Sequence, residues 1–330
     1  MTVRIRLKRA LATTLALAGL FTPLAACGGP SATAKNTGAD GLTHLKWGYS
    51  LTDSAPILLG IQDGVFEKHG LKVDASEVGA ADLVGGLISG SFDLSVQTGP
   101  GLALAVGQKV PITAVSGVTT FEAGAAKTTG SALLVAEDSD IKRPKDLEGK
   151  KVGVNLLKSA SEFGVRQDVT DDGGDADKVE IVEIPFASAR DGLAKGQIDA
   201  ALVADPVLSQ LLDSGAAKAP MGDPIEKVFG ASPRLVITAS KDWAAKNPKV
   251  VEQVQAAIKE SLELAAKNPD RLLPIYEKHY KMTPAIAKAT KLNAFKADID
   301  PDSFAVINDV LVRYGALAKP VNSADLTVAP

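Results

Sequence analysis

The chain has 330 residues, of which 45% are hydrophobic, and its 39 acidic and 36 basic residues give a formal net charge of −3. This length suffices for two lobes of ordinary domain size, and the acidic balance argues against nucleic acid, which needs a basic face. The three histidines are far apart and there is one cysteine, so we expect no metal site; no cofactor motif is visible either.

The first 26 residues have the pattern of a secretory signal peptide. Four basic side chains precede an apolar run at 10–21 that is too short to cross a bilayer. The run leads to LAAC at 24–27, which resembles a bacterial lipobox; this resemblance implies that the sulfur of Cys27 receives a lipid and that cleavage makes Cys27 the N-terminus. The alternative is a buried cysteine near an ordinary cleavage point.

Residues 27–42 contain almost no bulky apolar side chain and cannot build a core, which predicts a flexible tether. With a lipid on Cys27, the folded part would be held at the extracytoplasmic face of the cell membrane.

The rest of the chain contains an internal repeat. Residues 86–93 read GLISGSFD and residues 192–199 read GLAKGQID, a shift of 106 positions, and Pro100 falls on Pro206 at the same shift. Upstream, KWG at 46–48 faces KVG at 151–153 at a shift of 105. The matched order of these segments predicts two lobes of similar topology.

Each repeat alternates strands with helices, and we expect three strands in each, at 45–50, 71–78 and 92–97 and at 150–155, 178–184 and 198–203. This alternation predicts an α/β fold with parallel strands. Gly90 and Gly196 are placed to end helices in the left-handed conformation, while Pro100 and Pro206 suit a first helical turn.

Ligands of open α/β sheets bind at the carboxyl ends of the strands, where the loops here lead into helix N-termini that favour anions. The candidate ligand-binding residues in these loops are Thr52, Asp53, Ser54, Gln97, Thr98, Gly99, Phe121, Lys158, Ser159, Phe186 and Asp205. Gly99 would let a ligand approach the backbone. Phe121 and Phe186 are either pocket walls or ordinary core, and we expect Trp47 in the core.

Several of these residues have a second interpretation. Asp53, Ser54 and Ser159 could be simple helix N-caps. Lys158 either adds positive potential at a helix start or is a solvated surface lysine. Asp205 is either the N-cap of the helix that follows it or the acceptor for an amine or ring N–H of the ligand.

Two long segments resemble a known family. Residues 63–118 include DGVFEKHGLKVD and GLISGSFDLSVQTGPGLALAVGQKVPI, and residues 133–215 include DSDIKRPKDLEGKKVGV and LAKGQIDAALVADPVLSQLLDSG. Both resemble the nitrate, sulfonate and taurine group of ABC-transporter substrate-binding proteins, as does SPRLVITASKDWAAKNPKVVEQV.

This resemblance implies a periplasmic binding protein type II fold, in which two α/β lobes are joined by two hinge strands with a ligand cleft between them. Lobe 1 would comprise 43–130 and 234–330, and lobe 2 would comprise 131–233. The C-terminal part is expected to be helical, with capping residues before the prolines of Asn247-Pro248, Asn268-Pro269, Thr283-Pro284 and Asp300-Pro301. A stripe of Val250, Val254, Ile258 and Leu262 is expected to pack in the core.

The resemblance also implies a function. We expect a monomeric lipoprotein that captures a small organic anion, such as a sulfonate or a taurine-like compound, and delivers it to an ABC permease and its ATPase. The alternatives are a binder of an aromatic acid or a pyrimidine-type vitamin precursor, and a ligand-sensing lipoprotein without a transport role. We do not expect an enzyme, because the single cysteine would be used for the lipid and no catalytic triad, P-loop or HExxH motif is visible.

Overall fold

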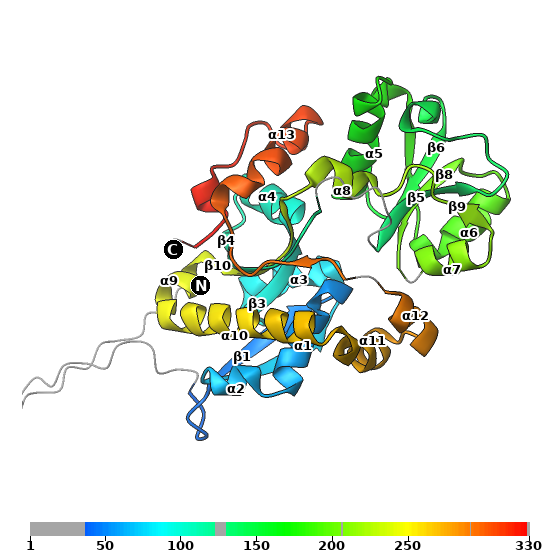
Figure 1. The fold of residues 1–330 in the computed structure, drawn as a ribbon. Helices are drawn as coiled ribbons and strands as arrows, with labels where there is room; N and C mark the ends of the chain where they lie inside the picture. Colours follow the sequence, from blue (N-terminus) through cyan, green and yellow to red (C-terminus); the bar gives the residue numbers. More distant parts are fainter. Residues whose placement is uncertain (1–36, 123–129, 206, 291, 329–330) are drawn as a thin grey trace, which may run out of the picture.

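The computed structural model describes residues 37–122, 130–205, 207–290 and 292–328. The predicted signal peptide, Cys27 and most of the predicted tether lie outside the described residues, as does Pro206. Two lobes are visible in Figure 1, each built on its own sheet, and the polypeptide crosses between them twice. This is the two-lobed α/β architecture expected from the sequence.

Lobe 1 contains a six-stranded sheet with the order β11-β4-β10-β3-β1-β2. Its strands are β1 (Thr43–Tyr49), β2 (Leu71–Glu77), β3 (Leu94–Thr98), β4 (Ile112–Thr120), β10 (Pro233–Ser240) and β11 (Ala294–Phe295). The first three are parallel, whereas β10 runs antiparallel to its neighbours β3 and β4. The three strands expected from the first repeat are therefore present and parallel.

Lobe 2 contains a five-stranded sheet with the order β7-β6-β8-β5-β9. Its strands are β5 (Ser131–Ala136), β6 (Lys151–Val154), β7 (Glu180–Glu183), β8 (Ala200–Ala204) and β9 (Ala217–Lys218). The parallel trio β7-β6-β8 matches β2-β1-β3 of lobe 1, and each trio is followed by an antiparallel strand. The internal repeat thus corresponds to a duplicated sheet topology.

The repeated aspartates make the same contact in both lobes. The carboxylate of Asp93 accepts a hydrogen bond from Lys46 N at 2.8 Å, and that of Asp199 accepts one from Lys151 N at 2.8 Å. In return, the N–H of each aspartate donates to the carbonyl of the same lysine. Each aspartate joins the third strand of its repeat to the start of the first, which explains why both repeats carry it.

The repeated glycines are explained by close packing. In lobe 1 the Phe92 ring lies so near the backbone that a Cβ on Gly86 would be 2.2 Å from it. In lobe 2 a Cβ on Gly192 would be 3.0 Å from the Ile198 side chain. The apolar residue before the aspartate therefore packs on the preceding helix at a point where a side chain would interfere.

Helices cover both sheets. In lobe 1 they are η1 (Thr52–Ser54), α1 (Ala55–Gln62), α2 (Val65–Lys68), α3 (Ala80–Ser89), α4 (Gly99–Gly107), α9 (Lys241–Lys246), α10 (Pro248–Lys267), η5 (Pro269–Leu272), α11 (Leu273–Tyr280), α12 (Pro284–Ala289), η6 (Pro301–Phe304), α13 (Ala305–Arg313) and η7 (Ser323–Asp325). In lobe 2 they are η2 (Pro144–Leu147), α5 (Ala160–Asp171), η3 (Ala176–Lys178), η4 (Phe186–Ser188), α6 (Ala189–Ala194), α7 (Val207–Asp213) and α8 (Pro224–Phe229).

The predicted apolar stripe lies on α10, which packs against α1. Val254, Ile258 and Leu262 are buried in the lobe 1 core together with Trp47, as expected. Val250 is only partly buried, and Val251 next to it is buried. The stripe is therefore a core feature, shifted slightly around the helix at its first turn.

The predicted helix ends are mostly confirmed. Gly90 ends α3 in the left-handed conformation with φ of 74°, and Pro100 lies in the first turn of α4. Gly196 is also left-handed, with φ of 63°, and directly follows Lys195, the C-cap of α6, where a glycine commonly ends a helix. Thr283 and Asp300 cap the helices that follow them by accepting backbone N–H groups.

The other two predicted caps are wrong, because their side chains do not accept hydrogen bonds from the helices that follow them. Asn247 and Asn268 hold the N-cap positions of α10 and η5, but neither side chain caps its helix. Their amides donate backwards instead, to Trp243 O at 2.8 Å and Leu264 O at 3.3 Å. The reason is that another helix ends at each asparagine, and its unpaired carbonyls compete for the amide.

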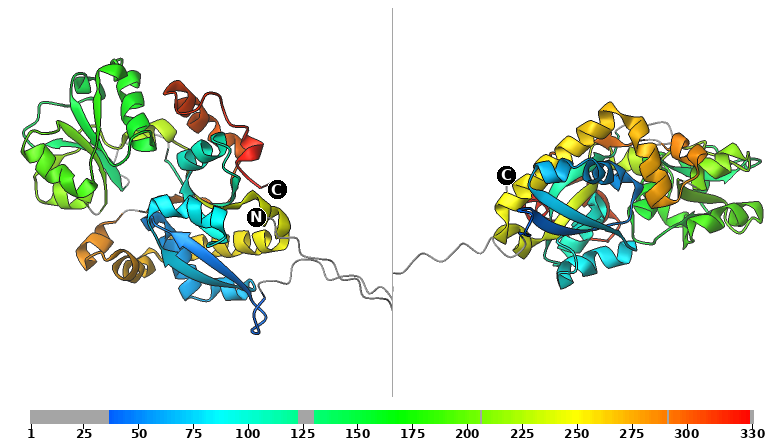
Figure 2. Two further views of the ribbon diagram at one scale, coloured as in Figure 1. Left: turned by 180° about the vertical axis from the view of Figure 1, so that it is seen from behind. Right: turned by 90° about the horizontal axis from the view of Figure 1, so that it is seen from below.

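The lobes also touch through helices. Residue 120 ends β4 in the lobe 1 sheet and residue 131 begins β5 in the lobe 2 sheet, while α8 precedes β10 on the return. Helix α13 of lobe 1 reaches both α5 and α8 of lobe 2 (Figure 2). There the rings of Phe163 and Tyr314 are stacked with centroids 6.0 Å apart, and Arg313 donates to Gln167 Oε1 at 2.7 Å.

Candidate ligand-binding site

The carboxyl ends of the parallel strands in each lobe face the other lobe. In lobe 1, β10 enters from lobe 2 and its first residues pair with the end of β3, so that Leu235 lies opposite Thr98. In lobe 2, β5 begins where the chain enters from lobe 1, and Ser131 pairs with Ala204 at the end of β8. The loops at 50–54 and 97–99 therefore lie on the same side of the molecule as the junction, and so do those at 155–159 and 205 (Figure 1).

Four buried polar atoms lie at this edge of lobe 1 without a hydrogen-bond partner among the described residues. They are Ser50 Oγ after β1, Ser54 Oγ before α1, Gln97 Nε2 on β3 and Thr119 Oγ1 on β4. The side chains of Ser54 and Thr119 are only 0% and 1% exposed. A buried polar group without a partner costs about 1–3 kcal/mol, so a ligand that pairs with these atoms would recover that energy.

A fifth such atom, Trp47 Nε1, lies within β1 in the core of lobe 1. Close to the edge, Tyr280 donates its hydroxyl hydrogen to Leu51 O at 2.8 Å. Burial raises the pKa of Tyr280, although the neighbouring Ser54 hydroxyl opposes the rise. The phenol therefore stays protonated and fixes the loop that carries Leu51 and Ser54.

A largely buried arginine organises the charges beside these atoms. Arg234, the second residue of β10, donates to Asp53 Oδ2 at 3.2 Å and to Glu226 Oε1 at 2.5 Å. Its guanidinium lies 5.3 Å from the centre of the Phe121 ring, and Asn293 donates to the other oxygen of Asp53 at 2.5 Å. Burial lowers the pKa of Arg234, but the nearby carboxylates outweigh this effect and raise it, so the arginine stays charged.

The first turn of α8 connects this arginine to both crossings between the lobes. Glu226, which is 1% exposed, also accepts from the backbone N–H of Glu122 just after β4, at 2.6 Å. Asp223 caps α8 and accepts from the Ser131 hydroxyl at the start of β5. Burial raises the pKa of Asp223, against the effect of its hydrogen bond with Ser131. Two carboxylates three residues apart thus contact β4, β5 and β10 where these strands meet the junction.

The corresponding edge of lobe 2 is more exposed, and its polar groups bond locally. Ser159 occupies the N-cap position of α5, but its hydroxyl donates to Leu156 O at 2.6 Å and does not cap the helix. Lys158 is exposed and left-handed with φ of 54°, and its N–H donates to Glu162 at 2.8 Å. Asp205 Oδ1 accepts from the N–H and the hydroxyl of Ser209, which is the geometry of a cap on α7.

The remaining predicted residues have structural contacts of their own. Thr98 caps α4 by accepting from Gly101 N at 3.1 Å. A Cβ on Gly99 would lie 2.0 Å from Pro233 O, so the close approach at this glycine is made by β10. Phe121 is 4% exposed and packs in the core, with its ring 5.6 Å from that of Phe229. Phe186 is half-buried against the lobe 2 core.

Seven of the predicted site residues thus share the edge of lobe 1, namely Thr52, Asp53, Ser54, Gln97, Thr98, Gly99 and Phe121, and four share that of lobe 2, namely Lys158, Ser159, Phe186 and Asp205. Sequence reasoning missed Ser50, Thr119, Glu226, Arg234 and Asn293. For Arg234 a signal exists, because a charged residue at the start of the apolar run LVITA suggests a buried partner. For Asn293 there is none, because its partner Asp53 lies 240 positions away.

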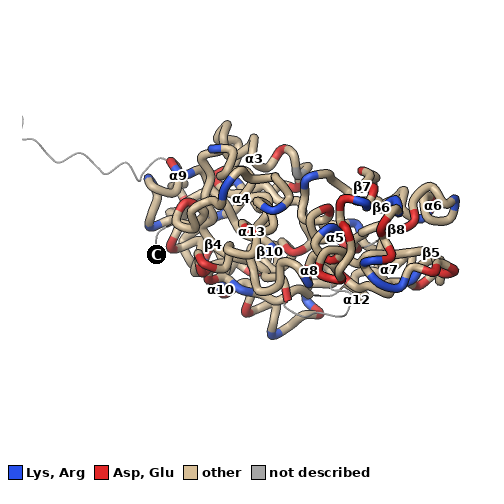
Figure 3. Tube along the Cα trace, turned by 90° about the horizontal axis from the view of Figure 1, so that it is seen from above, with Lys and Arg blue, Asp and Glu red and all other residues tan. Residues whose placement is uncertain are grey.

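Acidic and basic residues alternate over both lobes in Figure 3, and no continuous basic face is visible in that view. The described part of the chain contains no group of three or more acidic, histidine or cysteine side chains that could hold a metal ion. Within the same part, every helix is too short or too polar to span a bilayer.

The chain matches the NMT1/THI5-like family over residues 51–272, which is more than half of its length. It belongs to this family. Bicarbonate-binding protein CmpA from Synechococcus elongatus is 25% identical over 253 residues, which are 69% of this chain and 55% of CmpA. The chain therefore spans about half the length of the curated relatives it matches.

Solved structures share the fold of this family member. The periplasmic aliphatic sulphonate binding protein SsuA from Escherichia coli superposes with a TM-score of 0.74 at 19% identity, covering 87% of this chain and 92% of SsuA. The desulfurization enzyme DSZB superposes with a TM-score of 0.62 at 16% identity, covering 86% of this chain and 96% of that enzyme. Because binding proteins and an enzyme share the fold, the function must be argued from the site.

Proposed function

We propose that this protein is the solute-binding component of an ABC importer, which captures a small organic anion such as a sulfonate or a taurine-like compound and delivers it to a permease and its ATPase. The observation that carries the proposal is the set of unpaired atoms of Ser50, Ser54, Gln97 and Thr119, buried at the edge of lobe 1 that faces lobe 2. The family and the names of its relatives CmpA and SsuA support the same class.

The chemistry of these atoms suits an oxyanion. Three hydroxyls and one amide N–H can each donate to an oxygen of the ligand, and hydrogen bonds to a charged group are worth about 1.5–3 kcal/mol each. Arg234 is already matched by Asp53 and Glu226, so it holds the site together and is not the ligand's counter-ion. The anion would be held by uncharged donors, with the N-terminus of α5 and Lys158 facing it from lobe 2.

Capture would involve closure of the two lobes. A ligand shifts the protein to the closed form only if it binds that form more tightly than the open one. Contacts from both lobes provide this preference, because the groups at 155–159 and 205 reach the ligand only after closure. We infer that the protein performs no covalent chemistry and that the closed form is what the permease recognises.

An aromatic acid or a pyrimidine-type vitamin precursor is the second candidate. It is favoured by the tyrosines near the edge, where the rings of Tyr49 and Tyr276 lie 6.2 Å from that of Tyr280. The carboxylates of Asp53 and Glu226 also make the edge of lobe 1 less attractive to a strong anion than a free arginine would. A ligand with an acidic end and a donor group satisfies both lobes.

A thermal-shift screen of sulfonates, nitrate, bicarbonate, aromatic acids and pyrimidines tests the proposal, because a ligand of the native state raises the melting temperature with its concentration. Asp205→Asn then reports on a ligand amine: asparagine keeps an acceptor for Ser209 but loses the charge. We expect it to weaken a zwitterion by about 1.5–3 kcal/mol and to spare a simple anion. A screen in which no class stabilises the protein, or in which a compound is converted, would contradict the proposal.

We also propose that Cys27 carries the lipid and that the folded part is a monomer held at the extracytoplasmic face of the membrane. The order of basic start, apolar run and LAAC supports this. Mass spectrometry of the membrane fraction should find the acyl mass on Cys27, and Cys27→Ser should release the protein. An N-terminus mapped elsewhere, with Cys27 unmodified, would rule the anchor out.

A further inference from the structure

Large apolar side chains that remain exposed are concentrated at the edges that face the junction. In the described part of the chain, four such side chains are exposed, namely Leu51 at 37%, Ile88 at 50%, Leu156 at 54% and Leu157 at 43%. Only Ile88 lies elsewhere, on α3. Leu51 follows β1 and Leu156 follows β6, and both occupy the same position of the internal repeat, 105 residues apart.

The loops that carry these leucines are held in place by hydrogen bonds. Leu51 O accepts from the Tyr280 hydroxyl at 2.8 Å and from Ser54 N at 2.9 Å. Leu156 O accepts from the Ser159 hydroxyl at 2.6 Å, and Leu157 N donates to Glu183 at 3.1 Å. Since both backbones are fixed in this way, each leucine is exposed to solvent at a defined position. This exposure costs free energy, because apolar surface is left in contact with water.

The leucine of lobe 1 adjoins the unpaired hydrogen-bonding groups. Ser50 precedes Leu51 directly and Ser54 follows it by three residues, and both serine hydroxyls are buried without a partner among the described residues. A single short loop therefore offers a hydrogen-bonding surface beside an apolar one. Leu156 and Leu157 lie on the edge of lobe 2 that faces this loop, so closure would bring apolar surface to the ligand from both sides.

From this arrangement we propose that the ligand is amphiphilic, with its polar end at Ser50 and Ser54 and an apolar group held between Leu51 of lobe 1 and Leu156 and Leu157 of lobe 2. The inference rests on the proposed binding function and specifies the class of ligand within it. Leu51, Leu156 and Leu157 select for the apolar group. A small inorganic anion leaves these leucines exposed to water and binds weakly.

The test is titration calorimetry of the full chain with 1-alkanesulfonates from methanesulfonate to octanesulfonate, and with carboxylates and ammonium compounds carrying the same chains. Each methylene that becomes buried should raise the affinity about fourfold, until the apolar space between the lobes is filled. Leu51→Ser, Leu156→Ser and Leu157→Ser should each weaken the longest binding compound about tenfold. The same variants should leave the shortest one unchanged.

Ile88→Ser is the matched control, because it removes an equally exposed apolar side chain away from the junction and should change no affinity. The inference is overturned if affinity does not depend on the length of the alkyl chain for any head group. In that case the proposed function still stands, provided that short anions bind. Leucine variants that bind every compound normally but fail to stimulate the permease ATPase also overturn the inference, because the leucines would then be a permease contact. If no compound of this series or of the wider screen binds, the proposed function fails as well.

Discussion

The two lobes share a sheet topology but differ at the edges that face each other. In both, an aspartate joins the third strand of the repeat to the first by the same pair of hydrogen bonds, through Asp93 in lobe 1 and Asp199 in lobe 2. The edge of lobe 1 then adds a buried arginine with two carboxylates and four buried atoms without partners among the described residues. On the edge of lobe 2, Ser159 bonds within its own loop and Asp205 bonds to Ser209 on α7.

This difference indicates a division of labour. Lobe 1 holds its polar groups in a fixed and incompletely paired arrangement, which suits the first capture of a ligand. Lobe 2 has an exposed edge at which Ser159 and Asp205 already have hydrogen-bond partners, which suits a surface that closes over a ligand already bound. The duplicated strands provide the scaffold in each lobe, and the function of each depends on residues that the repeats do not share.

The largest effect should come from the buried arginine of lobe 1. Arg234→Ala removes the positive charge that lies between the carboxylates of Asp53 and Glu226 in a largely buried network, and it should reduce the free energy of unfolding by about 3–5 kcal/mol. The control is Arg143→Ala, which breaks the more exposed pair with Asp172 on lobe 2 and should reduce the free energy of unfolding much less, because solvent screens this pair. Urea titrations measure the free energy of unfolding of both variants. Equal losses would show that the Arg234 network of lobe 1 contributes no more to stability than the exposed ion pair of lobe 2.

Ligand affinity should depend on the unpaired groups of lobe 1 more than on lobe 2. Ser54→Ala and Thr119→Val should each weaken binding of an anionic ligand by about 1.5–3 kcal/mol, while the stability of the free protein is unchanged or higher, because an unpaired buried hydroxyl is removed. Ser159→Ala on lobe 2 serves as the control and should change affinity less. Calorimetry and thermal melts measure the two quantities, and normal affinity in both lobe 1 variants would contradict the division of labour.

The aspartate on lobe 2 should behave as a helix cap. Asp205→Ala removes the acceptor for Ser209 and should lower the stability by about 0.5–2 kcal/mol, the usual cost of losing a cap. Asp205→Asn keeps an acceptor and should lose less. Denaturant titration checks the order of the two variants; a loss for Asp205→Asn as large as that for Asp205→Ala would mean that the charge, and not the cap, is what matters.

The smallest effect concerns pH. His279 Nδ1 lies 3.0 Å from the Tyr49 hydroxyl, and burial, followed by the charge of Lys278, lowers the pKa of His279 below 6.5. The unfolded chain therefore binds this proton more readily, so the contribution of His279 to stability is complete above pH 6.5 and is lost as the pH falls through the lowered pKa. His279→Gln should make the melting temperature depend less on pH over this range, and thermal melts between pH 5 and pH 8 measure the difference. If the melting temperature of the wild type depends as little on pH as that of the variant, the pKa of His279 is not lowered.

Patterns local in sequence allowed much of the fold to be predicted. The repeats at 86–93 and 192–199 placed three parallel strands in each lobe, and Gly90 and Pro100 marked helix ends, because backbone conformation at these residues depends on near neighbours. The caps at Asn247 and Asn268 were wrong because a second helix end lay within reach of each amide.

The candidate site was less predictable, because its important contacts join distant segments. Arg234 meets Asp53 across 181 positions, and Asn293 meets it across 240. The unpaired state of Ser54 and Thr119 is a property of packing, since it depends on what fails to reach them. Loop position alone identified Ser54 and Gln97 as candidates but could not separate them from Thr98, whose hydroxyl is occupied as a cap.

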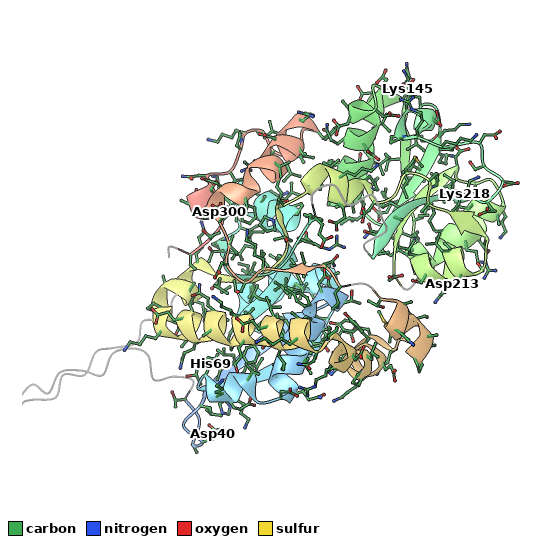
Figure 4. All side chains as sticks on the ribbon, viewed as in Figure 1. Asp40, His69, Lys145, Asp213, Lys218 and Asp300 are labelled. Carbon is green, nitrogen blue, oxygen red and sulfur yellow. The ribbon has the colours of Figure 1, made fainter. Side chains whose placement is uncertain are left out.

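Closure of the two lobes on a ligand is the central claim, and a distance across the junction tests it most directly. Asp213 at the end of α7 and Lys288 on α12 are exposed, and these helices lie on opposite lobes in Figures 1 and 2, with Asp213 labelled in Figure 4. Because the chain has one cysteine, Cys27→Ser with Asp213→Cys and Lys288→Cys provides two unique dye positions. Two-dye energy transfer should show a shorter distance when a stabilising compound from the screen is added, with a midpoint that follows its calorimetric affinity. A compound that binds tightly while the distance stays constant would contradict the claim.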